Sequence, residues 1–189
     1  MFRRLPVVSF LPILFLLGSC SSKTSENSTT QGGVKRDNVS ELGTVSTRTG
    51  LAPNFSWTDS TGTQVSFDAY KGKLTLVNFW ATWCGPCKKE LPDLEAISKE
   101  LAPRGLRIIG VSTDRGSNVI QDVRGFVREH GLSYQIIISN EQLEQAFGNI
   151  LALPTSFLVD EQGKVVQSFI GMRSKEAFLE AIEPYLKQG

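Results

Sequence analysis

The stretch KLTLVNFWATWCGPCKKELPDL, residues 73–94, decides the fold of this chain. Its first eight residues form a continuous apolar strand pattern, as expected for a sheet that is covered on both faces. Apolar side chains then recur at helical spacing, so we expect a helix over residues 84–101. A buried strand that leads into a helix opens a β-α-β unit, and Cys84 and Cys87 lie at the junction.

The position of the two cysteines predicts their chemistry. Cys84 is expected at the helix N-terminus, and Pro86 fits the first turn because its missing N–H needs no partner there. Unpaired N–H groups and the helix dipole favour a thiolate at that end, where thiol pKa values run from roughly 3.5 to 7.5. Cys84 is therefore the predicted nucleophile. Cys87 lies one turn further in, is more enclosed, and is the predicted resolving thiol.

Glu90 is the second candidate for chemistry at this site. At 100° per residue it falls on the same helix face as Cys87, Leu91 and Leu94. A carboxylate on an apolar face should be partly buried, with its pKa raised by desolvation. Such a group can exchange protons with Cys87 during disulfide chemistry. The alternative is that Glu90 reaches solvent from the edge of the apolar stripe.

The remaining patterns predict an α/β fold in one domain, residues 51–189. A β-α-β unit is followed by a β-hairpin and a helix, which indicates a mixed central sheet with helices on both sides. Ser174 is a suitable N-cap for the last helix, and Pro184 is expected to distort its end. The expected strands and hairpins cover residues 54–67, 73–80, 106–113, 133–138 and 155–170, and the further helices cover residues 118–130, 141–148 and 174–186.

Composition excludes several classes of function. The net charge of +1 implies no strong attraction to nucleic acid. Three cysteines are too few for a disulfide-stapled scaffold. A structural zinc site normally has four ligands, and the domain adds only His130 to the two cysteines of the motif as a soft ligand. We interpret His130 as a packed or helix-capping residue, and no metal is predicted.

The N-terminus has the pattern of a signal peptide, residues 1–19. Arg3 and Arg4 precede an apolar run, residues 5–18, that is short for a membrane-spanning helix. The run ends in LGSC, residues 17–20, which resembles the bacterial lipoprotein signal. That likeness implies that Cys20 becomes the first mature residue and carries the lipid. The alternative is an ordinary secretory signal in which Cys20 has no role.

Residues 20–50 are expected to form a flexible tether. They are rich in Ser, Thr, Gly and Asn and contain few large apolar side chains. Such a segment cannot bury enough surface to offset the entropy of ordering. Together with the lipid on Cys20, the tether would place the folded domain above a membrane.

Two motifs together resemble the thioredoxin superfamily, and most closely its membrane-anchored, extracytoplasmic TlpA/ResA branch. They are NFWATWCGPCKKELPDL, residues 78–94, and LALPTSFLVDEQGKVVQSFIG, residues 151–171. The likeness covers roughly residues 51–186. It implies the thioredoxin fold with an N-terminal β-hairpin extension and a helical insertion, which we place around residues 118–138.

The resemblance also implies roles for individual residues. Pro154 matches the cis-proline that faces the dithiol, and the backbone of Leu153 would pair with a bound substrate strand. Glu90 matches the active-site glutamate of ResA-like proteins. Asn78 replaces a buried Asp of cytosolic thioredoxin, and it is either a structural amide or a support for catalysis. The motif itself matches in Trp83, the attacking Cys84, Gly85, Pro86 and the resolving Cys87.

The expected activity is reduction of disulfides in client proteins by the Cys84–Cys87 dithiol without another cofactor. The resemblance implies the CxxCH sites of apocytochromes c as one client class. A DsbD- or CcdA-like membrane protein would donate the electrons, and we expect a monomer. The alternatives are a disulfide-forming oxidant and a thiol peroxidase. The chain lacks the PxxxTxxC pattern of the second alternative, because Thr82 is present without a Pro at that spacing. The expected direction of electron flow, from the dithiol to the client, rests on the Gly85–Pro86 pair and on the resemblance.

Overall fold

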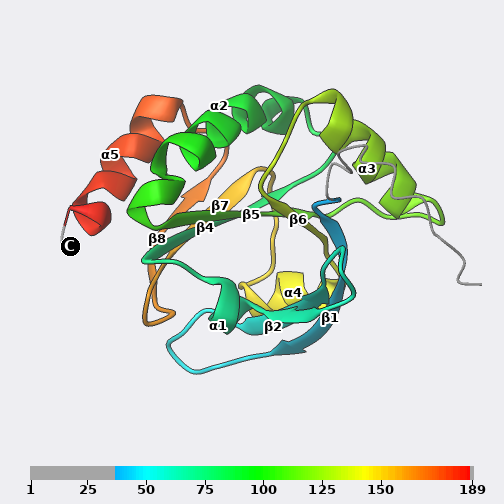
Figure 1. The fold of residues 1–189 in the computed structure, drawn as a ribbon, viewed down its shortest axis with the longest axis horizontal. Coiled ribbons are helices and arrows are strands. Elements are labelled where there is room, and N and C mark those ends of the chain that lie inside the picture. Colours follow the sequence, from blue (N-terminus) through cyan, green and yellow to red (C-terminus); the bar gives the residue numbers. More distant parts are fainter. Residues whose placement is uncertain (1–36, 188–189) are drawn as a thin grey trace, which may run out of the picture. The chain divides into compact units, whose positions relative to one another are not determined.

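The computed structural model describes residues 37–187, which form a sheet with helices on both faces (Figure 1). The predicted signal peptide, Cys20 and the first part of the predicted tether lie outside these residues. No helix within residues 37–187 is long and apolar enough to cross a bilayer.

One mixed sheet of eight strands forms the centre of the domain, in the order β3-β2-β1-β6-β5-β4-β7-β8. β4 pairs in parallel with β5 and antiparallel with β7, so the motif follows the end of an interior strand of the sheet. The predicted hairpin is β7 paired antiparallel with β8. The strands are β1 Val39–Ser46, β2 Asn54–Thr58, β3 Gln64–Ser66, β4 Leu74–Trp80, β5 Leu106–Ser112, β6 Gln135–Ile138, β7 Thr155–Asp160 and β8 Val165–Ile170.

The helices divide between the two faces of the sheet, as the apolar strands predict. Helices α2, α3 and α5 cover one face and α1 and α4 the other (Figure 1). Each face has its own group of buried apolar side chains, and every residue of β4 is buried. The helices are α1 Phe67–Tyr70, α2 Gly85–Leu101, the 3₁₀ turn η1 Ala102–Arg104, α3 Val119–Glu129, α4 Glu141–Ala146 and α5 Lys175–Leu186.

The predicted start of the domain at residue 51 is wrong. β1 begins at Val39, pairs in parallel with β6 and antiparallel with β2, and buries Val39 and Ser40. The second half of the predicted tether is therefore part of the sheet. The reason is tertiary: β6 and β2 provide partners on both sides for a strand that has only two buried residues at its start.

The predicted insertion, residues 118–138, contains more than a helix. α3 ends at Glu129, and β6 then enters the sheet between β5 and β1. At the C-terminus, α5 begins after the N-cap Ser174, whose hydroxyl accepts from the Ala177 N–H at 3.3 Å, and runs through Pro184 to Leu186.

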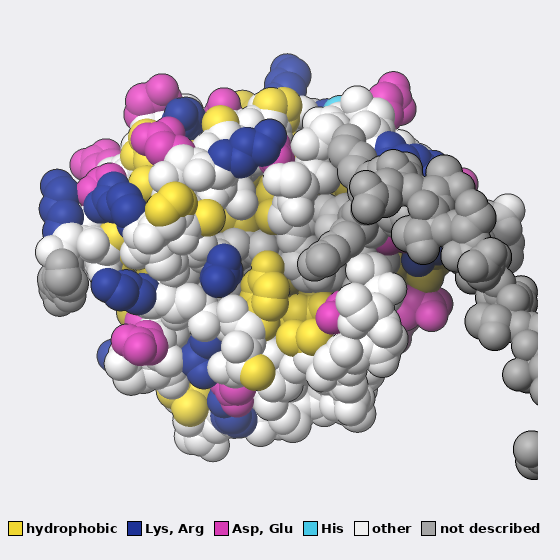
Figure 2. Space-filling view, viewed as in Figure 1, with side chains coloured by type: hydrophobic (Ala, Val, Ile, Leu, Met, Phe, Trp, Pro, Cys, Tyr) yellow, Lys and Arg dark blue, Asp and Glu magenta, His cyan; other side chains and the backbone are white. Residues whose placement is uncertain are grey.

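Charged side chains of both signs are interspersed over the face of the molecule seen in Figure 2, and hydrophobic side chains form smaller groups among them. This distribution agrees with a net charge of +1. It gives that face no extended field of one sign.

Candidate functional site

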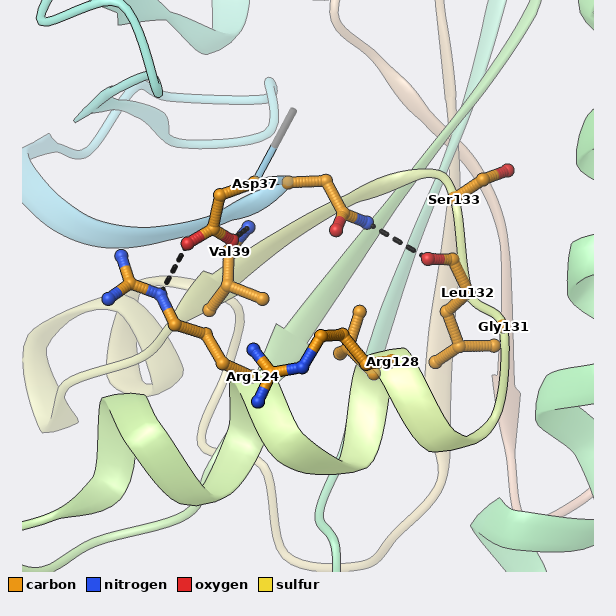
Figure 3. A pocket seen from close by; sticks show the side chains of 9 residues that line it. Asp37, Val39, Arg124, Arg128, Gly131, Leu132 and Ser133 are labelled. Carbon is orange, nitrogen blue, oxygen red and sulfur yellow. Dashed lines mark hydrogen bonds and ion pairs between the residues drawn. The ribbon is translucent and has the colours of Figure 1, made fainter. Parts of the chain in front are cut away.

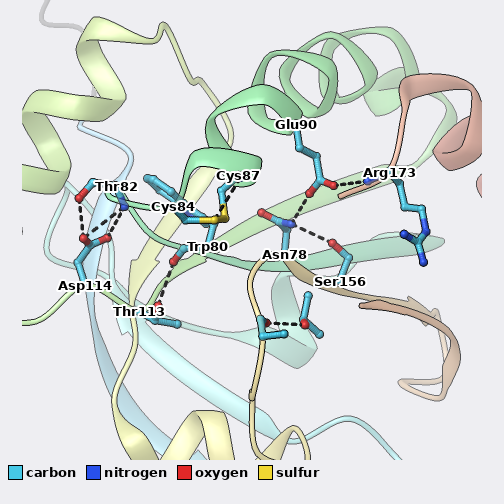
Figure 4. The surroundings of a disulfide bond; sticks show 12 residues. Asn78, Trp80, Thr82, Cys84, Cys87, Glu90, Thr113, Asp114, Ser156 and Arg173 are labelled. Carbon is cyan, nitrogen blue, oxygen red and sulfur yellow. Dashed lines mark hydrogen bonds between the residues drawn. A yellow bond between two sulfur atoms is a disulfide. The ribbon is translucent and has the colours of Figure 1, made fainter. Parts of the chain in front are cut away.

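Cys84 and Cys87 form a disulfide at the start of α2, with their Cα atoms 5.3 Å apart (Figure 4). Cys84 is 5% exposed and Cys87 is 1% exposed. The structure therefore shows the oxidised form of the pair, with Cys87 the more enclosed sulfur, as the sequence predicts.

The start of α2 is arranged to favour negative charge on Cys84. Cys84 is the N-cap of the helix, and its Sγ accepts a hydrogen bond of 3.2 Å from the Cys87 N–H. Pro86 lies in the first turn, where no N–H is missed. In the reduced protein the same N–H and the helix dipole would stabilise a thiolate at Cys84.

Glu90 is buried on the sheet side of α2, and its side chain points toward β4 (Figure 4). Its Oε1 accepts from Asn78 Nδ2 at 3.0 Å, and its Oε2 accepts from the Arg173 N–H at 2.7 Å. Burial raises the pKa of Glu90 and the two hydrogen bonds lower it by less, so the pKa lies at about 7, above the reference value of 4.5. The expectation of a buried glutamate is confirmed, and the solvent-facing alternative is wrong.

Asn78, on β4, connects Glu90 of α2 to Ser156 of the neighbouring strand β7. It is fully buried, and its Nδ2 also donates to Ser156 Oγ at 2.9 Å. Its Oδ1 has no hydrogen-bond partner in the described part of the chain. Asn78 therefore touches the predicted proton-exchanging group directly.

The Leu153–Pro154 peptide bond is cis, as the resemblance implied. Pro154 O accepts from the Gly171 N–H at 2.8 Å, which ties this segment to the loop after β8. Leu153 makes no backbone–backbone hydrogen bond to any described residue. Leu153 also lines a groove of about 680 Å³ beside the disulfide. The other lining residues are Trp83, Cys84, Gly85, Pro86, Thr113, Arg115, Glu141, Glu144, Ile150, Leu151 and Ala152.

Two apolar side chains of this groove are unusually exposed. Trp83 is 69% exposed and Leu151 is 93% exposed. Exposed apolar side chains beside a reactive group are typical of a surface that binds another molecule. The groove is therefore the place where a partner can reach Cys84.

Asp114 holds the loop that precedes Cys84, and the sequence analysis missed it. It accepts from the Thr82 N–H at 3.0 Å, from the Thr82 hydroxyl at 2.6 Å and from the Ser112 hydroxyl at 2.8 Å (Figure 4). The only signal in the sequence is a polar run directly after a buried strand. Ser156 and Arg173 were missed too, because they contact Glu90 and Asn78 from distant parts of the chain.

A second hollow, of about 340 Å³, lies between β1 and α3 (Figure 3). Arg124 forms an ion pair of 2.6 Å with Asp37 at its edge. No residue of the disulfide groove lines it. At the end of α3, His130 is the C-cap, its ring stacks on Phe126, and its Nδ1 lies 3.0 Å from Phe126 O. Of the two predicted roles, helix capping is confirmed, and the residue itself is exposed.

Comparisons with known proteins agree on the family. Residues 50–168 match the sequence profile of the AhpC/TSA family. The chain is 37% identical to the thiol-disulfide oxidoreductase ResA of Bacillus thuringiensis over 137 residues, which are 72% of this chain and 75% of that protein. It is 33% identical to ResA of Bacillus subtilis over 120 residues, 64% of this chain and 65% of that protein.

Solved structures give the same result. A thiol:disulfide interchange protein from Chlorobium tepidum is 33% identical, with a TM-score of 0.64 over 74% of this chain and 97% of that one. The exposed lipoprotein thioredoxin Etrx1 of Streptococcus pneumoniae is 26% identical, with a TM-score of 0.57 over 69% of this chain and 98% of that one. With its disulfide at the start of α2 and its cis-proline beside it, the chain belongs to the AhpC/TSA family and is a thioredoxin-fold, ResA-like thiol-disulfide oxidoreductase.

Proposed function

We propose that this oxidoreductase reduces disulfides in client proteins outside the cytoplasm while a lipid on Cys20 anchors it to a membrane. The observation that carries the mechanism is the buried Glu90 carboxylate one turn after Cys87, with a pKa of about 7, and the direction rests on the Gly85–Pro86 pair and on the likeness to ResA. A base with that pKa can take the Cys87 proton near neutral pH.

The reaction proceeds by two thiol–disulfide exchanges. The Cys84 thiolate attacks one sulfur of the client disulfide, an S–S bond to Cys84 forms, and the other client sulfur leaves as a thiolate that takes a proton. Cys87 then gives its proton to Glu90, and its sulfur attacks Cys84 Sγ. The second client sulfur leaves Cys84 as a thiolate and takes up a proton. Two electrons pass to the client, and Cys84 and Cys87 end as the disulfide.

The groove supports binding of an extended client segment. Its apolar wall contains Trp83 and Leu151, and the free backbone of Leu153 can hydrogen-bond to an added strand. The disulfide lies in the same groove, so a bound cysteine pair would meet Cys84. Apocytochrome c CxxCH sites, which offer a cysteine pair, are one client class that we propose.

A second protein must return the electrons, because the disulfide formed after each cycle cannot be reduced by the client. A DsbD- or CcdA-like membrane protein fits this need, since an extracytoplasmic compartment is oxidising. The ResA names of the relatives and the lipoprotein character of the Etrx1 neighbour support this location and anchor.

The reduction potential of the Cys84–Cys87 pair tests the direction. We expect a value closer to that of thioredoxin, roughly −270 mV, than to that of the oxidant DsbA, roughly −120 mV. Equilibration with dithiol buffers of known potential would measure it. A value near that of DsbA would refute the reductase, and rapid turnover of hydrogen peroxide would favour the thiol-peroxidase alternative.

Trapping identifies the clients. Cys87→Ser should accumulate mixed disulfides through Cys84, because the resolving step is lost. Cys84→Ser, which keeps a single buried thiol at Cys87, is the matched control and should trap none. Proteomics of the trapped species would name the client class.

A further inference from the structure

The three side chains Glu90, Asn78 and Ser156 form a buried hydrogen-bonded row below α2 (Figure 4). Each is at most 2% exposed. They come from α2, β4 and β7, and Ser156 follows the cis-Pro154 segment by two residues. The row therefore runs from the helix of the dithiol to the strand that begins beside the client groove.

Within residues 37–187, the Asn78 amide makes its side-chain hydrogen bonds through the nitrogen and none through the oxygen. Both protons on Nδ2 are donated, one to Glu90 Oε1 and one to Ser156 Oγ, whereas Oδ1 has no partner among the described residues. Buried polar atoms are nearly always paired, because an unpaired one has lost its hydrogen bonds to water without a replacement. The arrangement suits an ionised Glu90, which can only accept.

The same site also suits a protonated Glu90 if the amide turns over. Rotation by 180° would point Oδ1, with its two lone pairs, at the same two neighbours. A protonated carboxyl group and a serine hydroxyl can both donate, so Oδ1 would gain two hydrogen bonds. The amide would then release the two bonds that its Nδ2 makes to Glu90 and Ser156.

We propose that Asn78 and Ser156 are positioning residues that follow the proton on Glu90, the Asn78 amide turning over each time Glu90 gains or loses it. This inference rests on the proposed role of Glu90 as proton acceptor for Cys87. When the Cys87 thiol gives its proton to Glu90, the S–H bond breaks, an O–H bond forms, and the sulfur becomes a thiolate. The turned amide then accepts the new O–H.

Other charged groups near Glu90 act steadily in both states. The Arg173 charge lowers the pKa of Glu90 and the Asp93 charge raises it, and the Arg173 N–H bonds the other carboxylate oxygen. Tyr134 is neutral near pH 7, because burial raises the pKa of its phenol, and Glu90 raises it further. Of the two side chains that Asn78 bonds, the Ser156 hydroxyl can change from acceptor to donor with no change of charge, whereas Glu90 must gain a proton to do so.

Removing the Ser156 hydroxyl tests the proposal. In Ser156→Ala, one Nδ2 proton loses its acceptor while Glu90 is ionised, whereas the turned amide still accepts from protonated Glu90. The variant should therefore favour the protonated form of Glu90 and shift the midpoint of the Glu90 titration upward by roughly 0.5 to 1 pH unit. The titration is followed by NMR of the Glu90 carboxyl carbon in the oxidised protein, where neither cysteine titrates.

Ser40→Ala is the matched control. Ser40 Oγ accepts from Gln135 Nε2 at 3.1 Å in a part-buried amide–serine pair between β1 and β6, far from the dithiol along the sheet. Its loss should leave the Glu90 midpoint unchanged. Ser156→Thr keeps the hydroxyl and should return the midpoint to the wild-type value.

The wild-type protein provides a test that needs no variant. The side-chain NH₂ signals of Asn78 should shift with the same midpoint as the Glu90 carboxyl carbon. Signals of Asn78 that stay constant through that midpoint, or a Ser156→Ala midpoint within about 0.1 unit of wild type, would overturn the inference. Neither result depends on disulfide reduction, so failure of the proposed reductase would be seen separately.

Discussion

At the level of single residues, Glu90 has a property that suits catalysis and lowers the stability of the fold. Its folded-state pKa of about 7 lies above the reference value of 4.5, because burial penalises the carboxylate more than Asn78 and Arg173 stabilise it. A glutamate useful as a base near neutral pH is thus one that destabilises the fold when ionised. Function and stability oppose each other at this residue.

The pH dependence of stability follows from the sign of that shift. Below pH 4.5 Glu90 is protonated in both states, and its burial costs least. Between pH 4.5 and about 7 the unfolded chain releases the proton first, so the free energy of unfolding falls as pH rises. Above the folded pKa the loss is complete and amounts to about 3 kcal/mol.

Glu90→Gln should remove this pH dependence, because the amide does not titrate. Relative to the variant, the oxidised wild-type protein should lose about 3 kcal/mol between pH 4.5 and 8. Denaturant unfolding of both proteins at several pH values measures the difference. Curves that remain parallel across this range would mean that Glu90 is not the group responsible.

At the level of elements, β1 shows why composition alone was misleading. Its sequence VSELGTVS resembles the polar stretch before it, and only its first two residues are buried. What makes it a strand is pairing with β6, whose residues lie about a hundred positions further along the chain. A strand that is formed by its partners leaves little trace in its own periodicity.

Val39→Ala should therefore destabilise the domain, although it lies in the predicted tether. Val39 is 4% exposed in the core under α3, so loss of its two methyl groups should lower the free energy of unfolding by about 1–3 kcal/mol. Thr49→Ala, at an exposed position in the same predicted segment, is the control. Equal stability of both variants and wild type would restore the tether interpretation for residues 37–50.

At the level of the whole molecule, the sequence reveals local features and misses long-range ones. The buried β4, the helix from Cys84 and the inward direction of Glu90 all follow from spacing within about thirty residues. Asn78 could be singled out only because it replaces a charged residue of a related family. Ser156 and Asp114 reach the site from β7 and from the end of β5, and no periodicity connects them to Cys84.

The position of β1 also limits the height of the enzyme above a membrane. If Cys20 carries a lipid, residues 21–38 are all that separate it from the sheet. Fully extended, they span at most roughly 60 Å. With such an anchor, clients and the proposed electron donor would meet the domain within about that distance of the bilayer surface.

Cys20→Ser should release the protein from that surface. A diacylglyceryl group provides two acyl chains, which anchor stably where a single chain binds only marginally. We expect wild-type protein in the membrane fraction, with a mass increased by the lipid, and Cys20→Ser without the adduct. Cys84→Ser, which changes a thiol of the folded domain, should fractionate like wild type. Wild-type protein that is recovered unlipidated, in soluble form and beginning at a residue other than Cys20 would contradict the anchor while leaving the dithiol chemistry intact.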